Sequence, residues 1–459
     1  MKLSCWSVRL AASSLLCGFL AGAEPEPVRL ITVDPGHFHA ALIQKTMLAG
    51  MSDLVRIYAP LGPDLAAHLN RIAAFNSRAD QPTRWRLEIY AGADFLERML
   101  ARPEGNVVVL SGRNRDKIRR VEAALGAGLH VLADKPWILE AADLPKLEAA
   151  LEEAERRRLV AYDAMTQRFE ISCILPRELV RDPEVFGKLQ AGTPSEPGAR
   201  MESLHYLLKT VAGIPNLRPA WYFDIAEQGE GLTDVGTHLV DLIMWTLFPD
   251  EAIDYRSQIR VLEGRRWPTV LSEDDYRRVT GERGFPAYLR NAVRDGRLEY
   301  FCNNRVLYTI RGVHVLLEVR WDYEAPPGKG DTSVAVFRGS RSTVEVRQGA
   351  EEKFIPEVYV VPAPGRKEAV GKALAARLKR ISGDYPGLAA EDQGSRFRIV
   401  IPPALRVSHE DHFALLVDRF LGYLRRPESL PAWEKPNMLA KYYVTTQGVA
   451  LGRRNPVRP

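Results

Sequence analysis

Short apolar runs alternate with segments of helical spacing over the first 160 residues of the chain. The runs that fit β-strands lie at residues 28–33, 54–59, 85–90, 106–111 and 130–136. The segments of helical periodicity lie at residues 39–50, 64–75, 93–101, 115–128 and 144–158. Strands that alternate with helices over short connections build a parallel sheet with helices on both faces. The sequence therefore predicts an α/β fold that begins with a doubly wound, Rossmann-like sheet, whose ligands bind beyond the carboxyl ends of the strands.

A different pattern follows residue 160. Apolar side chains alternate with mostly polar ones in residues 313–323, and residues 342–348 and 397–402 behave in the same way. Strands of this kind suit an antiparallel sheet with one solvated face. We therefore expect a Rossmann-like dinucleotide-binding domain over residues 24–160. An α+β domain with a largely antiparallel sheet should follow over residues 161–459, and its final helices (408–450) could pack back on the first domain.

The N-terminal residues have the layout of a secretory signal peptide. Lys2 and Arg9 lie near the start, an apolar stretch follows, and Ala21-Gly22-Ala23 offers a small-residue cleavage site. We expect residues 1–23 to be removed and the mature protein to be periplasmic or extracellular, without stable membrane insertion. An uncleaved anchor is the alternative.

The composition narrows the choice of partners. The chain has 63 basic and 58 acidic residues, a net charge of +5 that is too small and too dispersed to indicate nucleic-acid binding. We expect a small molecule as substrate. Two cysteines, Cys173 and Cys302, lie beyond the signal, and an oxidising compartment allows them either to pair or to stay free.

The turn after the first strand reads VDPGHFHAAL and stands where a Rossmann fold binds dinucleotide phosphates. Gly36 is its one glycine, so the G-x-G-x-x-G pattern is absent. The second strand ends at Tyr58-Ala59-Pro60, without the acid that binds ribose, and Asp64 is a distant substitute. The choice between NAD and NADP is therefore open, and an ordinary tight turn is the alternative for this segment.

Two further motifs carry side chains that can take part in proton transfer. Asp134-Lys135-Pro136 ends the fifth strand, where an ammonium can hydrogen-bond a substrate hydroxyl. In GEGLTDVGTHLVDL, Asp234 and His238 are four residues apart, so on a helix they share a face and the carboxylate can orient the imidazole. The alternatives are a surface lysine beside an aspartate and a buried, structural Asp–His pair. We interpret Asp241 in the same helix as structural.

Residues 202–224 combine cationic, imidazole and aromatic side chains, a mixture that suits carbohydrate. The candidate substrate contacts are His205, Lys209, Arg218, Trp221 and Tyr222. The first two have the i, i+4 spacing of one helix face. The alternative is a surface helix followed by core aromatic residues.

A well-signalled helix begins near the C-terminus at SHEDHF. Ser408 with Asp411 predicts a capping box. We interpret His409 and His412 as solvated or capping residues of the first turn rather than as a metal pair, and the sequence leads us to expect no metal site.

These motifs, in this order and spacing, resemble those of the Gfo/Idh/MocA family of nicotinamide-dependent oxidoreductases. AGLHVLADKP is similar to the end of a strand in that family, with Asp134 in place of the usual glutamate. GEGLTDVGTHLVDL is similar to its helix with a D-x-G-x-H core. RPAWYFD, RRWPTVL, APPGKGD and PAWEKPNMLAKYY resemble an exported bacterial branch with its own C-terminal domain. The chain departs from the family at the first turn, where Asp34 and His39 replace glycines, and at LSGRN after the fourth strand.

The resemblance implies hydride transfer between NAD or NADP and a carbinol carbon of a sugar or sugar-like substrate. Because free nicotinamide cofactor is scarce outside the cytoplasm, we expect an exported enzyme to hold its cofactor tightly. The resemblance assigns the catalytic positions to Lys135, at the substrate hydroxyl and the nicotinamide ribose, and to His238 as acid/base with Asp234 as its partner. The expected cofactor-binding residues are Asp34, Gly36, His37, Phe38, Ser111, Gly112, Asp134 and Lys135. The resemblance also implies a homo-oligomer paired through the antiparallel sheet.

Two other functions remain open from the sequence. The first is an NAD-dependent, glycoside-cleaving enzyme that oxidises a ring carbon transiently and returns the hydride after elimination. The second is a non-catalytic carbohydrate-binding protein on a degenerate oxidoreductase scaffold, which the missing glycines and the missing ribose acid favour.

Overall fold

Six parallel strands form the first sheet, in the order β3-β2-β1-β4-β5-β6. The strands are β1 (Leu30–Val33), β2 (Leu54–Ala59), β3 (Arg86–Ala91), β4 (Val107–Leu110), β5 (His130–Ala133) and β6 (Ala161–Asp163). The helices between them are α1 (His39–Leu42), α2 (Pro63–Ser77), α3 (Phe95–Ala101), α4 (Lys117–Gly126) and α5 (Leu144–Arg157). This arrangement confirms the predicted doubly wound sheet. The strand order reverses between β1 and β4, which is where such sheets bind ligands.

This computed structural model describes residues 26–211, 214–215 and 217–454. The predicted signal peptide, residues 1–23, lies outside the described residues. Within them, no helix combines the length and the apolar character that a membrane crossing needs.

The first sheet is buried on both faces because its strands are apolar at consecutive positions. Val108 and Leu110 of β4 face one hydrophobic core, and Val107 and Val109 face the other. A central parallel strand covered by helices on both sides requires such a continuous run. The second core also receives residues of the C-terminal helix α11 (His409–Arg425), of which Phe413, Leu416 and Phe420 are buried, as the helical spacing predicts.

Helix α1 is shorter than the spacing of residues 39–50 predicts. It ends at Leu42, and the next amides bond three residues back: Gln44 N–H to Ala41 and Lys45 N–H to Leu42. The carbonyls that a longer helix would use are occupied from elsewhere. Trp85 Nε1 donates to the carbonyl of Gln44 at 2.6 Å, and the guanidinium of Arg78 donates to that of Lys45 at 2.7 Å. The helix therefore stops because distant side chains take its acceptors.

A broad second sheet follows, and its strands are mostly antiparallel, as predicted. In spatial order they are β10 (Ile259–Leu271), β12 (Arg297–Ile310), β13 (Val313–Glu324), β7 (Ala199–Leu208), β14 (Thr332–Arg338), β15 (Ser342–Gln348), β16 (Glu357–Pro362), β18 (Phe397–Val400) and β17 (Ala389–Asp392), with β11 (Val293–Arg294) beside β12. The pairing of β7 with β13 is parallel. A separate pair is formed by β8 (Thr210–Val211) and β9 (Ile214–Pro215).

The helix interpretation of His205 and Lys209 is wrong, because His205 lies in β7 and Lys209 directly follows that strand. The strand lies inside the sheet, between β13 and β14, and Tyr206, Leu207 and Leu208 are buried. Pairing on both edges overrides the local spacing. The two side chains nevertheless meet, because both contact the carboxylate of Asp331.

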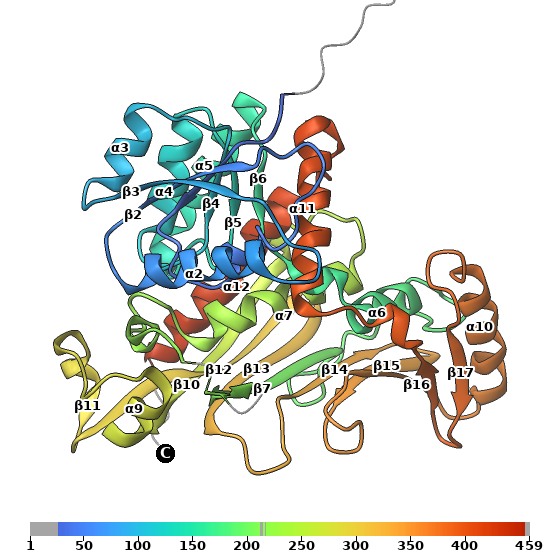
Figure 1. Cartoon of the computed structure of the whole chain (residues 1–459). Helices are drawn as coiled ribbons and strands as arrows, with labels where there is room; N and C mark the ends of the chain where they lie inside the picture. The colour runs from blue at the N-terminus through green and yellow to red at the C-terminus, as the bar shows by residue number, and fades with distance from the viewer. Residues whose placement is uncertain (1–25, 212–213, 216, 455–459) are drawn as a thin grey trace, which may run out of the picture.

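The remaining helices cover the second sheet and connect it to the first (Figure 1). They are α6 (Ile171–Val180), α7 (Gly231–Leu247), α8 (Tyr255–Gln258), α9 (Glu273–Thr280), α10 (Lys367–Arg380), α11 and α12 (Glu434–Arg454). Figure 1 shows α7 and the red α12 between the α/β unit and the second sheet.

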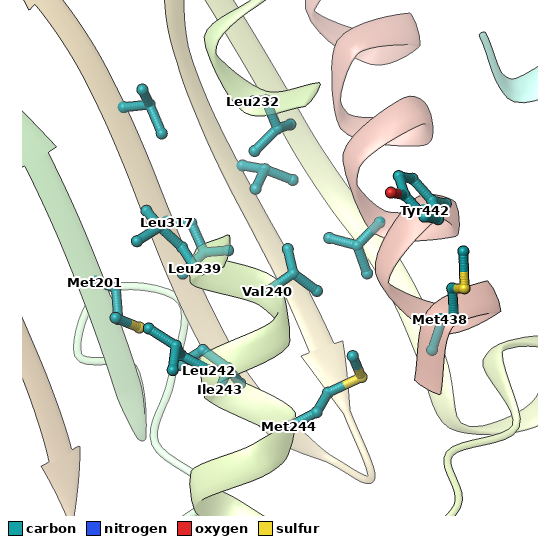
Figure 2. Close-up of a cluster of buried hydrophobic side chains, with 14 of the residues drawn as sticks. Met201, Leu232, Leu239, Val240, Leu242, Ile243, Met244, Leu317, Met438 and Tyr442 are labelled. Atoms are coloured by element: carbon teal, nitrogen blue, oxygen red, sulfur yellow. The ribbon is translucent and has the colours of Figure 1, made fainter. Parts of the chain in front are cut away.

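Helix α7 is almost wholly buried, and its apolar residues form the centre of the molecule. Figure 2 shows Leu239 and Leu242 of α7 near Leu317 of β13 and Met201 of β7, and Val240 turned toward Met438 and Tyr442 of α12. Each fully buried side chain of this size contributes about 1.5–3 kcal/mol. The helix therefore has a fixed position between the two sheets, which in turn fixes the polar residues on its other face.

A buried ionic network ties α12 to α7 and β6. Lys441 Nζ lies 2.9 Å from Asp163 Oδ2 and 3.2 Å from Asp241 Oδ1, and Arg168 lies 2.6 Å from the same Asp241 oxygen. Tyr442 Oη donates to Asp163 Oδ2 at 2.9 Å. Burial opposes ionisation of Asp241, but the two cations outweigh it and lower its pKa far below the usual range. The structural interpretation of Asp241 agrees with this arrangement. Cys173 and Cys302 are free thiols.

Candidate active site

The turn after β1 passes very close to the end of β4. A Cβ placed on Gly112 would lie 2.1 Å from the carbonyl oxygen of Asp34, and one on Gly36 would lie 3.2 Å from the ring of Trp221. Gly112 is therefore needed for the close approach of the two backbones, whereas a Cβ on Gly36 would press on side chains. The Gly36 amide donates to the Asp34 carbonyl at 2.9 Å, and the His37 amide donates to the Ser111 carbonyl at 3.1 Å. Both amides are used within the protein, unlike those of a glycine-rich phosphate loop.

Asp34, one of the candidate cofactor residues, adopts a left-handed conformation with φ 45°. Its carboxylate forms an ion pair with Arg120 of α4 at 2.8 Å and is buried. Phe38 is 40% exposed. The carboxylate of Asp34 is thus bound to Arg120 of α4 in this structure.

Asp134, at the end of β5, gathers three side chains around one carboxylate oxygen. Its Oδ2 lies 3.0 Å from His37 Nδ1, 2.9 Å from His39 Nδ1 and 3.1 Å from Ser111 Oγ. Burial alone would raise the pKa of Asp134, but the imidazoles outweigh it and hold the pKa well below its usual range. An ionised carboxylate can accept and cannot donate, so both histidines donate through Nδ1.

Lys135, next in the chain, forms a buried ion pair with Asp234 in the first turn of α7. Burial favours the neutral amine, but the carboxylates of Asp234 and Asp134 outweigh it and raise the pKa of Lys135. The same pairing lowers the pKa of Asp234 against the effect of burial. Tyr222 Oη donates to the second oxygen of Asp234 over 3.4 Å. Two segments 99 residues apart thus meet through opposite charges.

His238 lies one helical turn after Asp234 and is 7% exposed. Burial and the nearby charge of Lys135 lower its pKa well below the usual value, so the imidazole is neutral at neutral pH. Its Nδ1 has no hydrogen-bond partner among the described residues. The structure therefore pairs Asp234 with Lys135 and not, as the sequence predicts, with His238, because the ammonium lies nearer to the carboxylate. The neutral imidazole of His238 lies one turn further along the same helix.

Two cavities lie near the candidate site, and only the smaller one is lined by residues of α7. The larger, about 1190 Å³, is lined by Gly36, by Asp64 and Arg71 of α2, and by Arg113 and Trp221. The smaller, about 270 Å³, lies over β7 and β14. Its lining includes His205, Asp331, Val235, Leu239, His409 and His412. Lys135, Asp234 and His238 are not among the described residues that line either cavity.

The five candidate substrate residues are divided between these regions. His205 Nδ1 and Lys209 Nζ lie 3.0 and 2.5 Å from Asp331 Oδ2, at the smaller cavity. Arg218 and Trp221 line the larger one. Trp221 Nε1 donates to Asp64 at 3.0 Å, and Arg218 donates to the carbonyl of Leu207 at 2.9 Å. Tyr222 reaches Asp234, as described above. The structure therefore does not gather these residues at one point.

The comparisons with known proteins agree with this architecture. A family described as "Putative oxidoreductase C terminal domain" matches residues 175–453, which is more than half of the chain. The chain belongs to this oxidoreductase family. A crystal structure from Parabacteroides merdae, titled as a "putative oxidoreductase", is 42% identical to it, covers 94% of this chain and 98% of that chain, and superposes with a TM-score of 0.91. Among curated proteins, none matches the sequence.

More distant structures share the fold of this oxidoreductase. GenD2 from gentamicin A biosynthesis, in complex with NAD, is 14% identical, covers 94% of this chain and 95% of that chain, and has a TM-score of 0.54. KijD10, a 3-ketoreductase from Actinomadura kijaniata in complex with NADP and TDP-benzene, is 15% identical to this chain. The match covers 94% of this chain and 98% of that chain, with a TM-score of 0.55. The fold is that of the Gfo/Idh/MocA-like oxidoreductases.

Sequence reasoning missed several residues of this region in the oxidoreductase. Lys117 of α4 is buried, and its Nζ donates to the carbonyl of Asp134 at 2.8 Å, which steadies the end of β5. Burial lowers the pKa of Lys117 to about 8. His39 and His409 come into contact from opposite ends of the chain. The H-F-H triplet directly after a strand end was the available signal for His39. The sequence indicates His409 only as a solvated or capping residue, and nothing local indicates its contact with His39.

Proposed function

We propose that this oxidoreductase binds NAD or NADP and transfers hydride at a carbinol carbon of a sugar or sugar-like substrate. The observation that carries the proposal is the contact between Lys135 and Asp234, with the neutral imidazole of His238 one turn further along α7. An ammonium, a carboxylate and an uncharged imidazole at the carboxyl edge of a parallel sheet can bind an alcohol and accept its proton. A buried pair kept for stability alone would not need the third group.

The larger cavity fits a dinucleotide by its position and its donors. It adjoins the carboxyl ends of β1 and β4, where the strand order reverses, and Gly36 leaves room there that a Cβ would fill. The guanidinium groups of Arg71 and Arg113 suit phosphate oxygens. The carboxylate of Asp64 can accept from ribose hydroxyls. In this arrangement the protein holds the cofactor through side chains rather than through a glycine-rich backbone loop.

When bound, the nicotinamide supplies the hydride acceptor or donor. The chain's own residues have three tasks. The ammonium of Lys135 donates hydrogen bonds to the substrate oxygen, the imidazole of His238 holds the carbinol proton, and Asp234 keeps Lys135 charged. Burial of all three excludes water from the reacting atoms.

The lining of the smaller cavity supports a polyhydroxylated substrate. Ser203 Oγ, His205 Nε2 and His412 Nε2 are buried there without a hydrogen-bond partner among the described residues. Buried polar atoms without partners are costly unless a ligand or water satisfies them. Hydroxyl groups, which both donate and accept, suit this set.

The experiment that tests the proposal is mass spectrometry of the small molecules released when the purified protein is denatured, followed by incubation with glycosides without added cofactor. We expect NAD(H) or NADP(H) to be released, and the substrate to be oxidised at one carbon. Glycoside cleavage without net redox change would favour the transient-oxidation enzyme. If the protein carries no nucleotide, and if neither NAD nor NADP changes its melting temperature, the result would support the non-catalytic carbohydrate-binding function.

The division of labour and the location are part of the same proposal. We propose that residues 24–160 bind the dinucleotide, that residues 161–459 bind the substrate and pair subunits, and that residues 1–23 direct export. The layout of the first 23 residues supports export. N-terminal sequencing of protein from the periplasmic fraction, which should begin at Glu24, and the mass in solution test these points.

A further inference from the structure

Two histidines from opposite ends of the chain face each other beside the candidate active site. His39 of α1 and His409, the first residue of α11, place their Nε2 atoms 3.3 Å apart. The ring centroids are 5.3 Å apart, so the rings meet through their nitrogen edges rather than by stacking. The contact spans 370 residues of sequence and joins the first turn of the α/β sheet to a C-terminal helix.

The carboxylate of Asp134 fixes which nitrogen of His39 carries its proton. His39 Nδ1 lies 2.9 Å from Asp134 Oδ2, so the proton is on Nδ1 and the lone pair is on Nε2. Histidines that ligate metals commonly donate their other ring N–H to a carboxylate in this way.

The separation of the two Nε2 atoms matches the edge of a metal tetrahedron. Zinc binds imidazole nitrogen at about 2.0–2.1 Å, so two ligands of a tetrahedral ion lie about 3.3–3.4 Å apart. A direct N–H···N hydrogen bond of 3.3 Å would be long. We propose that His39 and His409 bind a divalent transition-metal ion of the zinc type through their Nε2 atoms, with Asp134 orienting His39. Imidazole ligands select such ions over magnesium or calcium.

The Nδ1 atoms of His37 and His39, which face Asp134, are less suited to a metal than the Nε2 atoms of His39 and His409. His37 Nδ1, His39 Nδ1 and one oxygen of Asp134 lie within 4.8 Å of one another. Both Nδ1 atoms, however, already form hydrogen bonds to the same carboxylate oxygen of Asp134. A metal at that point would have to displace both Nδ1 protons, whereas the Nε2 edge offers lone pairs.

One of the two proposed ligands lies at the smaller cavity, so we expect the remaining coordination positions to face that cavity. His409 lines that cavity, together with His412 and Glu170. A site with few protein ligands and access to a pocket is of the open kind, in which water or a ligand oxygen completes the shell. The oxygen that this cavity would offer to the metal is a hydroxyl or carbonyl of the bound small molecule.

The test is a calorimetric titration of zinc chloride into the full-length mature protein after dialysis against a chelator. We expect one zinc per chain. His39→Gln and His409→Gln should each weaken binding at least about 100-fold, and Asp134→Asn about 10–100-fold. His314→Gln, on β13, is the matched control and should bind as the wild type does. Absence of zinc binding by the wild type, or wild-type affinity in both ligand variants, would overturn the site.

A second measurement keeps the proposal open to refutation if the variants fold poorly. X-ray absorption of the zinc-loaded wild type should show two imidazole ligands at about 2.0–2.1 Å. A first shell without imidazole would overturn it. Neither measurement depends on nucleotide or turnover, so this site and the proposed oxidoreductase function can fail separately.

Discussion

Replacing Asp234 by asparagine removes the carboxylate that neutralises Lys135 inside the molecule. The side chains of Lys135 and Asp234 are 8% and 12% exposed, so solvent cannot take over the role of the lost partner. Removing one member of a buried pair costs about 3–5 kcal/mol, because it leaves an uncompensated charge. We expect Asp234→Asn and Lys135→Met each to lower the free energy of unfolding by this amount. The double variant removes both charges of the pair and should fall short of the sum by about 2–3 kcal/mol.

The assay is equilibrium urea unfolding followed by tryptophan fluorescence, with midpoints compared at a common m-value. The control is Asp143→Asn, which breaks an ion pair with Lys146. The side chains of Asp143 and Lys146 are 28% and 42% exposed, so this variant should lower the free energy of unfolding by less than about 1 kcal/mol. Additivity of the two site variants within about 0.5 kcal/mol would refute the reasoning, because independent groups behave in that way.

The difference in the free energy of unfolding between the wild type and Asp234→Asn should also depend on pH, which provides an internal check. The pKa of Asp234 is lowered in the folded state, so its stabilising effect is complete above the unfolded pKa of about 3.9. That effect is lost as the pH falls through the folded value. The gap between wild type and Asp234→Asn should therefore be constant above about pH 5 and shrink in stronger acid.

Four further predictions follow from the site and its surroundings. His238→Asn, which keeps the side chain polar, should lower kcat about 10²–10⁴-fold while bound nucleotide is retained, and an unchanged kcat would remove His238 from proton transfer. Arg113→Gln should weaken NAD(H) or NADP(H) binding about tenfold or more in a fluorescence titration, because a charge-assisted hydrogen bond is lost; unchanged affinity would contradict the assignment of the larger cavity. Gly112→Ala should lower the melting temperature and the retained nucleotide, because its Cβ would meet the Asp34 carbonyl at 2.1 Å, whereas Gly62→Ala, where nothing lies within 4 Å, should not. The pKa of His68 is lowered to about 4 by burial, so this histidine destabilises the fold as the pH drops below about 6.5. His68→Leu should therefore gain about 2 kcal/mol more at pH 5 than at pH 8, and equal gains at both would show that the imidazole does not titrate as described.

The parts of the fold that the sequence predicts well are those decided locally. Val107 to Leu110 form a strand because four consecutive apolar residues suit a position buried on both faces, and β2 has the predicted bounds. The capping box of Ser408 and Asp411 also forms as predicted, since its two groups are three residues apart. The common face of Asp234 and His238 follows from helix periodicity in the same way.

What the sequence misses is decided by residues far apart in the chain. The end of α1 depends on Trp85 and Arg78, which take the carbonyls of Gln44 and Lys45. The segment that holds His205 becomes a strand because both of its edges are paired. His39 and His409 are brought together by the packing of α11 on the first sheet, for which no local pattern exists.

The position of α12 has a consequence for the order in which the molecule can be completed. Asp163, Asp241 and Arg168 all precede residue 242, but Lys441, which balances the two carboxylates, lies on the last helix. An unfinished chain that lacks these last residues would enclose an excess of negative charge at its centre. The earlier segments therefore cannot reach their final arrangement before α12 is present, and removal of α12 should destabilise both sheets that it joins.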